Sequence, residues 1–215
     1  MLENKLMTGI IRHVQTNFWL YIISILCLCI GNVLGVYTVG YMSSFEKSDL
    51  LSYMKSFCST IVTANINSQS ILLESIKNNL IVLLAIWFLG LTMIGIPIIL
   101  LLEILKGFTI GYTTCFVVNG LGIKGIWISI LGVLPQNLIY IPCLIFASVL
   151  AMDFSITVLK SKENNKYPSL PLRIAAYSLS FVFVSIFMLL GCLIESYLTP
   201  NILKMTVINY GSVFI

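Results

Sequence analysis

Charged residues are scarce in this chain, and so are the residues from which soluble active sites are built. Only 9% of its 215 residues are charged, whereas a soluble domain has about 25%. Hydrophobic residues make up 59% of the sequence, and its mean hydropathy is +1.02. The net charge of +4 is scattered, which argues against nucleic-acid binding. We therefore expect one membrane domain over residues 1–215, in contact with lipids, and no soluble catalytic domain.

The usual catalytic and metal-binding motifs are also missing. The sequence contains no GxSxG, HExxH, Walker or CxxC motif, and its one histidine, His13, lies near the N-terminus. Intramembrane aspartyl proteolysis requires paired acids, but the acidic residues near the apolar runs, Glu103, Asp153 and Glu195, are far apart in sequence. We therefore expect no enzyme, no cofactor and no metal site.

Long apolar runs are what the sequence has in abundance. Each is near the roughly 20 residues that a helix needs to cross a bilayer, and together they predict an all-α, polytopic membrane protein with about five transmembrane helices. Glycines and prolines predict a broken-helix region near Gly120 to Pro142, and Gly95 and Pro97 predict a kink in the second span. The predicted segments are spans over 17–39, 80–102, 135–158 and 172–196, a short third helix after Gly107, a loop at 119–125 and a helix resuming near Ile126.

Two polar segments carry apolar residues at helical spacing. Residues 1–16 fit a cytoplasmic helix lying in the membrane interface, or a simple amphipathic lead-in to the first span. Residues 43–79 fit one or two extracytoplasmic surface helices. The apolar stripe of this second segment, which we interpret as a docking face for partner proteins, consists of Leu50, Met54, Phe57 and Ile61.

The distribution of Lys and Arg predicts the orientation in a bacterial cytoplasmic membrane. A cytoplasmic N-terminus puts seven basic residues inside and five outside, and it places the dense cluster from Lys160 to Arg173 in the cytoplasm. The C-terminus is then outside. The inside set is Lys5, Arg12, Lys106, Lys160, Lys162, Lys166 and Arg173, and the outside set is Lys47, Lys55, Lys77, Lys124 and Lys204.

Two GxxxG patterns occur within apolar runs, at Gly31 and Gly35 and at Gly107 and Gly111. Small residues at this spacing let two helix backbones approach closely. The contacts are either within the chain or between copies of it in a homo-oligomer, and the sequence leaves both open.

Polar residues inside apolar runs are costly and are candidates for function. They are Asn32, Gln136, Asn137 and Asp153, with Glu103 and Glu195 near the ends of runs. Spacing of three residues predicts that Glu103 pairs with Lys106 at the cytoplasmic surface, and Asp153 is close enough to Lys160 to reach the headgroups. Pro135 frees backbone groups, for which Gln136 and Asn137 are the nearest side-chain donors.

The residues from 103 to 145 resemble the stage II sporulation protein M family. The resemblance rests on Glu103, Lys106-Gly107, Gly111, the loop 119–125 and the stretch from Leu134-Pro135-Gln136-Asn137 to Ile141-Pro142. It implies a membrane scaffold for engulfment of the forespore, located in the mother cell's engulfing membrane, with the peptidoglycan-degrading stage II sporulation proteins D and P as partners. The chain departs from the family pattern at Gln136 and Tyr140, where that pattern has histidine and glutamate.

Two functional hypotheses follow. The first is a non-enzymatic anchor that binds peptidoglycan-remodelling proteins through residues 43–79 and its helix faces. The second is a transporter or channel subunit with a site at the broken helices, against which stands the absence of a visible inverted repeat.

Overall fold

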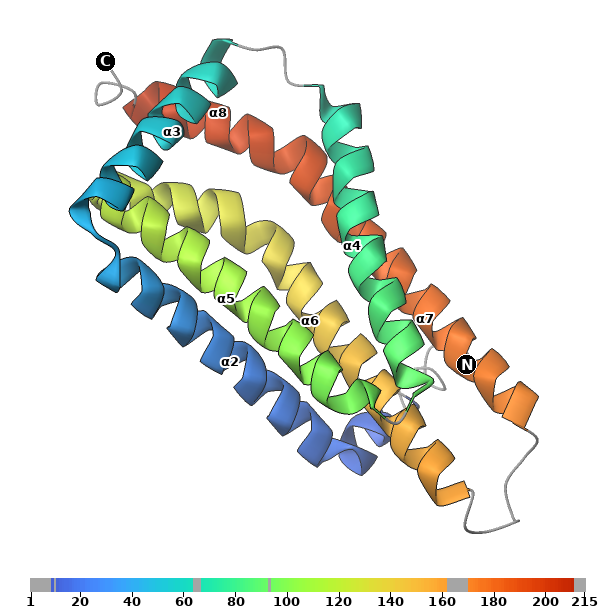
Figure 1. Cartoon of the computed structure of the whole chain (residues 1–215). Coiled ribbons are helices and arrows are strands. Elements are labelled where there is room, and N and C mark those ends of the chain that lie inside the picture. The colour runs from blue at the N-terminus through green and yellow to red at the C-terminus, as the bar shows by residue number, and fades with distance from the viewer. Residues whose placement is uncertain (1–8, 10, 64–66, 93, 162–169, 211–215) are drawn as a thin grey trace.

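A computed structural model describes residues 9, 11–63, 67–92, 94–161 and 170–210, and all the regular elements among them are helices (Figure 1). Five of the helices are long and apolar enough to cross a membrane. This confirms an all-α fold with five potential spans. The helices are α2 (Phe18–Tyr41), α3 (Ser44–Thr63), α4 (Ser68–Gly90), α5 (Gly95–Leu121), α6 (Ile123–Ser161), α7 (Leu170–Leu193), the π-helical turn η1 (Ile194–Leu198) and α8 (Thr199–Tyr210).

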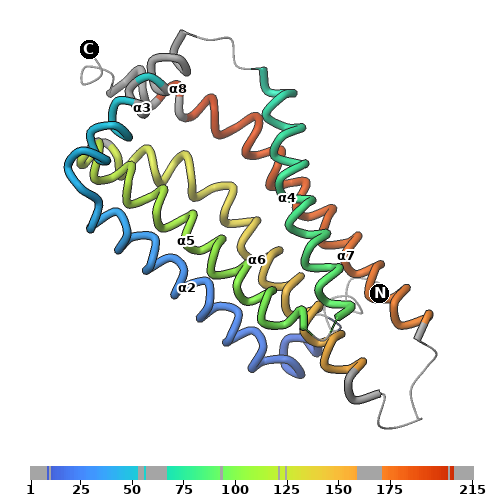
Figure 2. Tube along the Cα trace, in the orientation of Figure 1, coloured from blue at the N-terminus to red at the C-terminus, as the bar shows by residue number. Residues whose placement is uncertain are grey.

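Helix α6, with 39 residues the longest, contacts α2, α4, α5 and α7 (Figure 2). The buried core lies where these helices meet and is mostly apolar, with Ile86, Ile99, Ala147 and Met152 all at 1% exposure or less. The outer surface is apolar too: Trp19, Leu138 and Leu179 are each more than 70% exposed. Such a surface is stable in lipid and not in water.

The connections alternate between the two ends of the bundle (Figure 1). The start of α2, the turn between α4 and α5, the end of α6 and the start of α7 lie at one end. The α3 and α8 helices and the turn between α5 and α6 lie at the other, where α3 contacts α8. This alternation matches the order of crossings that the sequence predicts, while the side of the membrane stays a prediction.

The second span differs from its predicted position at 80–102. The α4 helix begins at Ser68 because the side chain of Asn67 accepts a hydrogen bond from the backbone N–H of Gln69, at 3.1 Å, and so caps the first turn. Residues 68–79, predicted as part of a surface segment, are therefore the first half of this span. A turn between α4 and α5 includes Leu91 and Thr92. Pro97 lies in the first turn of α5, where proline is tolerated, so it causes no kink inside a span.

The predicted broken region reduces to a single break at Gly122. Its φ of +60° belongs to the left-handed region that favours glycine, and Gly122 is the single residue between the end of α5 and the start of α6. The loop predicted at 119–125 is thus almost entirely helical. Pro135 and Pro142 lie inside α6, which continues past both, because a proline in a membrane helix can be accommodated by its neighbours.

Parts of two predicted amphipathic segments lie outside the described residues. Residues 1–8 and 10 are among these, whereas 11–16 are helical and lead into α2 through a turn at Asn17. In α3 the backbone of the predicted docking face is helical and Leu50 is partly buried. The side chains of Met54, Phe57 and Ile61 lie outside the described set.

Candidate functional site

A polar cavity of about 300 Å³ lies between α4, α5, α6 and η1. On α4 it extends from Ser75 to Val82, around the middle of that helix, and on α5 it includes Lys106, which is also near the middle of its helix. Polar groups in the membrane are expensive and mark functional sites by default, so this cavity is the candidate site. Its polar lining consists of Ser75, Asn78, Asn79, Lys106, Thr109, Thr113, Gln136, Asn137, Tyr140 and Glu195.

Tyr140 is the hub of the hydrogen bonds at this site. Its hydroxyl donates to Glu195 Oε2 at 2.6 Å and lies 3.3 Å from Cys192 Sγ, so α6 is joined to η1 and to the end of α7. The ring is 4% exposed and packs against Gly191, where a Cβ atom would come within 2.5 Å of it. Glycine at 191 therefore makes room for Tyr140 to reach Glu195.

Glu195 owes its position to the π-helical turn. A π-helical turn widens the helix by one residue and so changes the direction in which the following side chains point. In η1 this change coincides with the glutamate that faces the cavity. Such turns are frequent at functional sites, and here the turn separates α7 from α8.

Lys106 supplies the cation of the cavity. Its Nζ lies 5.7 Å from the ring centroid of Tyr140, within the range of a cation–π interaction. Lys106 and Glu195 both line the cavity, but no ion pair within 4.0 Å joins them in the part of the chain that the structure describes. The cavity thus presents one positive and one negative group that do not pair directly with each other.

The predicted surface pair of Glu103 with Lys106 is wrong, because both residues lie in the middle of α5. They point to different neighbours. Glu103 is fully buried and accepts a hydrogen bond from the hydroxyl of Ser24 on α2. Ser148 on α6 interacts with the same carboxylate. Both residues are fully buried and neither lines the cavity, so this second polar cluster is closed and separate from it.

The two amides after Pro135 have different partners. Gln136 Oε1 accepts from the hydroxyl of Thr199 at 3.1 Å, which joins α6 to α8. The Asn137 amide donates to the carbonyl of Val133 at 2.7 Å, within α6. Both residues line the cavity, and their hydrogen bonds help to place its α6 wall.

Asp153 lies in the second half of α6, beside the helical residues 11–16. Its Oδ2 is 3.8 Å from Nε2 of His13, whose other ring nitrogen is 3.3 Å from the Tyr21 hydroxyl. Burial lowers the pKa of His13 below its usual 6.5, and the nearby Asp153 carboxylate partly opposes this. Asp153 is therefore remote from the cavity and helps to fasten the N-terminal helix to the bundle.

The glycines of the two GxxxG patterns face each other across the contact of α2 with α5. A Cβ atom on Gly31 or Gly35 would lie within 2.3 Å of a carbonyl oxygen of α5, and one on Gly107 or Gly111 within 2.2 Å of a carbonyl oxygen of α2. The contact within the chain accounts for all four glycines.

Sequence reasoning did not identify the cavity as a unit. The sequence predicts a surface segment for Asn78 and Asn79 because its polarity puts the start of the second span at residue 80, whereas α4 begins at Ser68. The sequence likewise predicts a turn at Lys106, which lies inside α5. The signal that would have placed them is the cap at Asn67, which puts the start of α4 twelve residues earlier and includes both asparagines in the candidate span.

Fold and cavity together define a class: a polytopic helical membrane protein with a polar site enclosed by four helical elements. Comparison with models of protein families assigns the chain to a particular family within this class. Residues 24–200 match the model described as Stage II sporulation protein M. The match covers most of the chain, and the protein belongs to that family. No curated protein and no solved structure matched the chain.

Proposed function

We propose that the protein is a non-enzymatic membrane scaffold that holds peptidoglycan-remodelling proteins at the membrane during forespore engulfment. Membership of the family supports a role in sporulation, and five membrane-spanning helices support action at a membrane. The stage II sporulation proteins D and P are the proposed partners. In this proposal the protein lies in the mother cell's engulfing membrane with its N-terminus in the cytoplasm.

The observation that carries the proposal is the contact of α3 with α8 at one end of the bundle. Both helices follow a span directly, α3 after α2 and α8 after η1, so their positions are fixed by the membrane domain. A surface held in this way suits a scaffold because its partners are oriented relative to the bilayer. The apolar residues at helical spacing in α3 form the proposed docking face.

The test is to replace Leu50 and Phe57 together by aspartate and to measure which proteins co-purify from sporulating cells. The proposal expects loss of the two partners with normal membrane insertion. A matched control replaces Ser48 and Ser52, which are exposed on the same helix, by aspartate, and so adds equal charge. Partners retained on Leu50→Asp/Phe57→Asp, or lost equally from the control, would remove the docking face from the proposal.

A second candidate function, solute or ion transport, is favoured by the polar cavity alone. Transporters bind substrates at interrupted helices near the middle of the bilayer, and η1 is an interruption of this kind. Flux measured across liposomes that contain the purified protein distinguishes the two. Flux through the parent protein that Gln136→Leu abolishes would support the transport function and contradict the scaffold proposal.

A further inference from the structure

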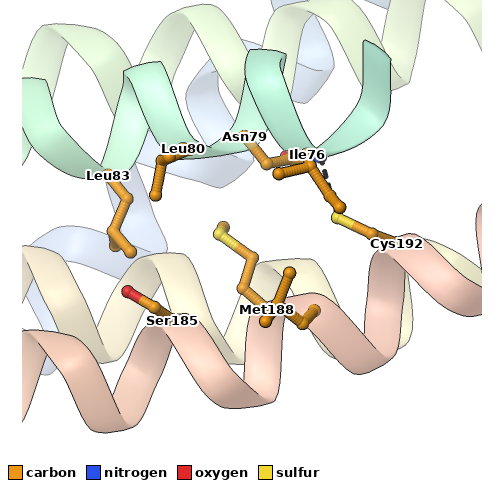
Figure 3. Close-up of a pocket in the computed structure, with 8 residues that line it drawn as sticks. Ile76, Asn79, Leu80, Leu83, Ser185, Met188 and Cys192 are labelled. Atoms are coloured by element: carbon orange, nitrogen blue, oxygen red, sulfur yellow. Dashed lines mark hydrogen bonds between the residues drawn. The ribbon is translucent and has the colours of Figure 1, made fainter. Parts of the chain in front are cut away.

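A narrow apolar groove runs between α4 and α7 on the lipid-facing side of the bundle. Two adjoining pockets of about 270 and 200 Å³ form it, and Leu80, Leu83 and Ser185 line both. In Figure 3 the labelled side chains of α4 and α7 point toward one another across the groove. Its floor is nearly closed, since Leu83 and Met188 are 3% and 5% exposed.

The groove ends at the polar cavity. Asn79 lines both spaces, and its amide donates to the Ser75 carbonyl at 2.9 Å and contacts Cys192 Sγ at 3.9 Å. Cys192, which lines the groove, also contacts the hydroxyl of Tyr140 in the cavity. The apolar groove therefore leads to the polar cavity, which contains one cation, Lys106, and one anion, Glu195.

The length of the groove matches the hydrocarbon thickness of one leaflet. Its α4 lining extends from Ile76 to Trp87, which is roughly 16 Å at 1.5 Å per residue. One leaflet contributes about 15 Å of hydrocarbon to a membrane core of about 30 Å. The polar end of the groove is the one nearer α3 and α8, because Ile76 and Asn79 come earlier in α4 than Trp87.

We propose that the groove and cavity together bind one phospholipid, with an acyl chain between α4 and α7 and a zwitterionic aminophospholipid headgroup in the cavity. Lys106 binds the phosphate, and Glu195 binds the primary ammonium group. Tyr140 holds the glutamate in place through its 2.6 Å hydrogen bond. This inference does not depend on the scaffold role.

The charges and the shape of the site select this occupant over a partner helix. A helix is about 10–12 Å across with its side chains, whereas the two helices that line the groove, α4 and α7, contact each other, so a helix cannot enter it. An alkyl chain is slim enough. An anionic lipid without an amine would satisfy Lys106 but leave Glu195 facing a phosphate, and like charges in a low-dielectric site repel strongly.

The test uses phosphatidylethanolamine with a photoreactive acyl chain, incorporated with the full-length protein into phosphatidylcholine vesicles. Crosslinks should map to the groove residues of α4 and α7. Leu80→Trp should fill the groove and reduce labelling there at least about fivefold. Ile81→Trp is the matched control, because Ile81 is the next residue of α4, is 55% exposed and lies outside the groove. The pair Ser185→Trp and Ile186→Trp repeats the comparison on α7, in case one variant fails to fold.

Headgroup selection is read from competition by unlabelled lipids. Phosphatidylethanolamine should displace the probe more strongly than phosphatidylglycerol, Lys106→Gln should weaken displacement by both, and Glu195→Gln should remove the preference. Equal labelling of Leu80→Trp and Ile81→Trp would mean ordinary boundary lipid and would overturn the site. Groove labelling with no headgroup preference, or with a preference for phosphatidylglycerol, would overturn the headgroup assignment.

Discussion

Substitution of Gly111 by alanine is predicted to destabilise the fold, because this glycine lets α5 lie directly against α2. The added Cβ atom would come within 2.2 Å of the Asn32 carbonyl oxygen, 2.9 Å of its carbon and 3.0 Å of its Cα. All three are backbone atoms, so relief requires the two helices to separate. Forcing extra atoms into a close-packed contact costs about 1–3 kcal/mol, and isoleucine at the same position should cost more than alanine.

Gly40 provides the matched control, because it lies on α2 but a Cβ atom there would meet nothing within 4 Å. Gly40→Ala should be neutral or stabilising by up to about 1 kcal/mol, the helix propensity difference between the two residues. The assay is reversible unfolding of the purified protein in a constant detergent mixture. A loss of about 1.4 kcal/mol corresponds to a tenfold change in the unfolding equilibrium. Equal stabilities of Gly111→Ala and Gly40→Ala would refute the close contact.

The remaining predictions concern topology, pH and the α6–α8 contact. A cysteine at Thr92 in the turn between α4 and α5 should resist membrane-impermeant thiol reagents in intact cells, and labelling there would reverse the proposed orientation. Because burial lowers the pKa of His13, the unfolded state binds its proton more readily, so thermal stability should fall as pH drops below about 6.5. Asp153→Asn should lower the His13 pKa further in an NMR titration, whereas an unchanged value would show that the carboxylate does not act on it. A double-mutant cycle of Gln136→Leu with Thr199→Val should give a coupling of about 0.6 kcal/mol, and zero coupling would mean that this hydrogen bond does not help to join α6 to α8.

The sequence was sufficient for the fold class because apolar runs long enough to cross a bilayer leave few alternatives to helices. It was also sufficient for the close glycine contact, where spacing alone identifies the residues, although not their partners. The boundaries of the spans are harder to predict from the sequence. The single capping residue Asn67 sets the start of α4 at Ser68, earlier than predicted and within a stretch whose polarity resembles that of a surface helix.

The candidate site was only partly predictable because its members come from four elements. The position of Gln136 and Asn137 after Pro135, and the charge of Glu195, mark these residues as candidates, but nothing in local spacing links them to Lys106. The π-helical turn that aims Glu195 into the cavity has no sequence pattern comparable to GxxxG or a proline. Sites that depend on the packing of distant helices require the three-dimensional arrangement.

Release of peptidoglycan fragments is the most direct test of the proposed scaffold. Hydrolysis of glycan or peptide links needs a positioned acid, base or nucleophile. The proposal assigns those groups to bound partners. Purified protein in liposomes is incubated with labelled sporulation-stage peptidoglycan, alone and together with the stage II sporulation proteins D and P. The account predicts no release by the protein alone and release confined to the liposome fraction when the partners are present. Release by the protein alone would contradict it.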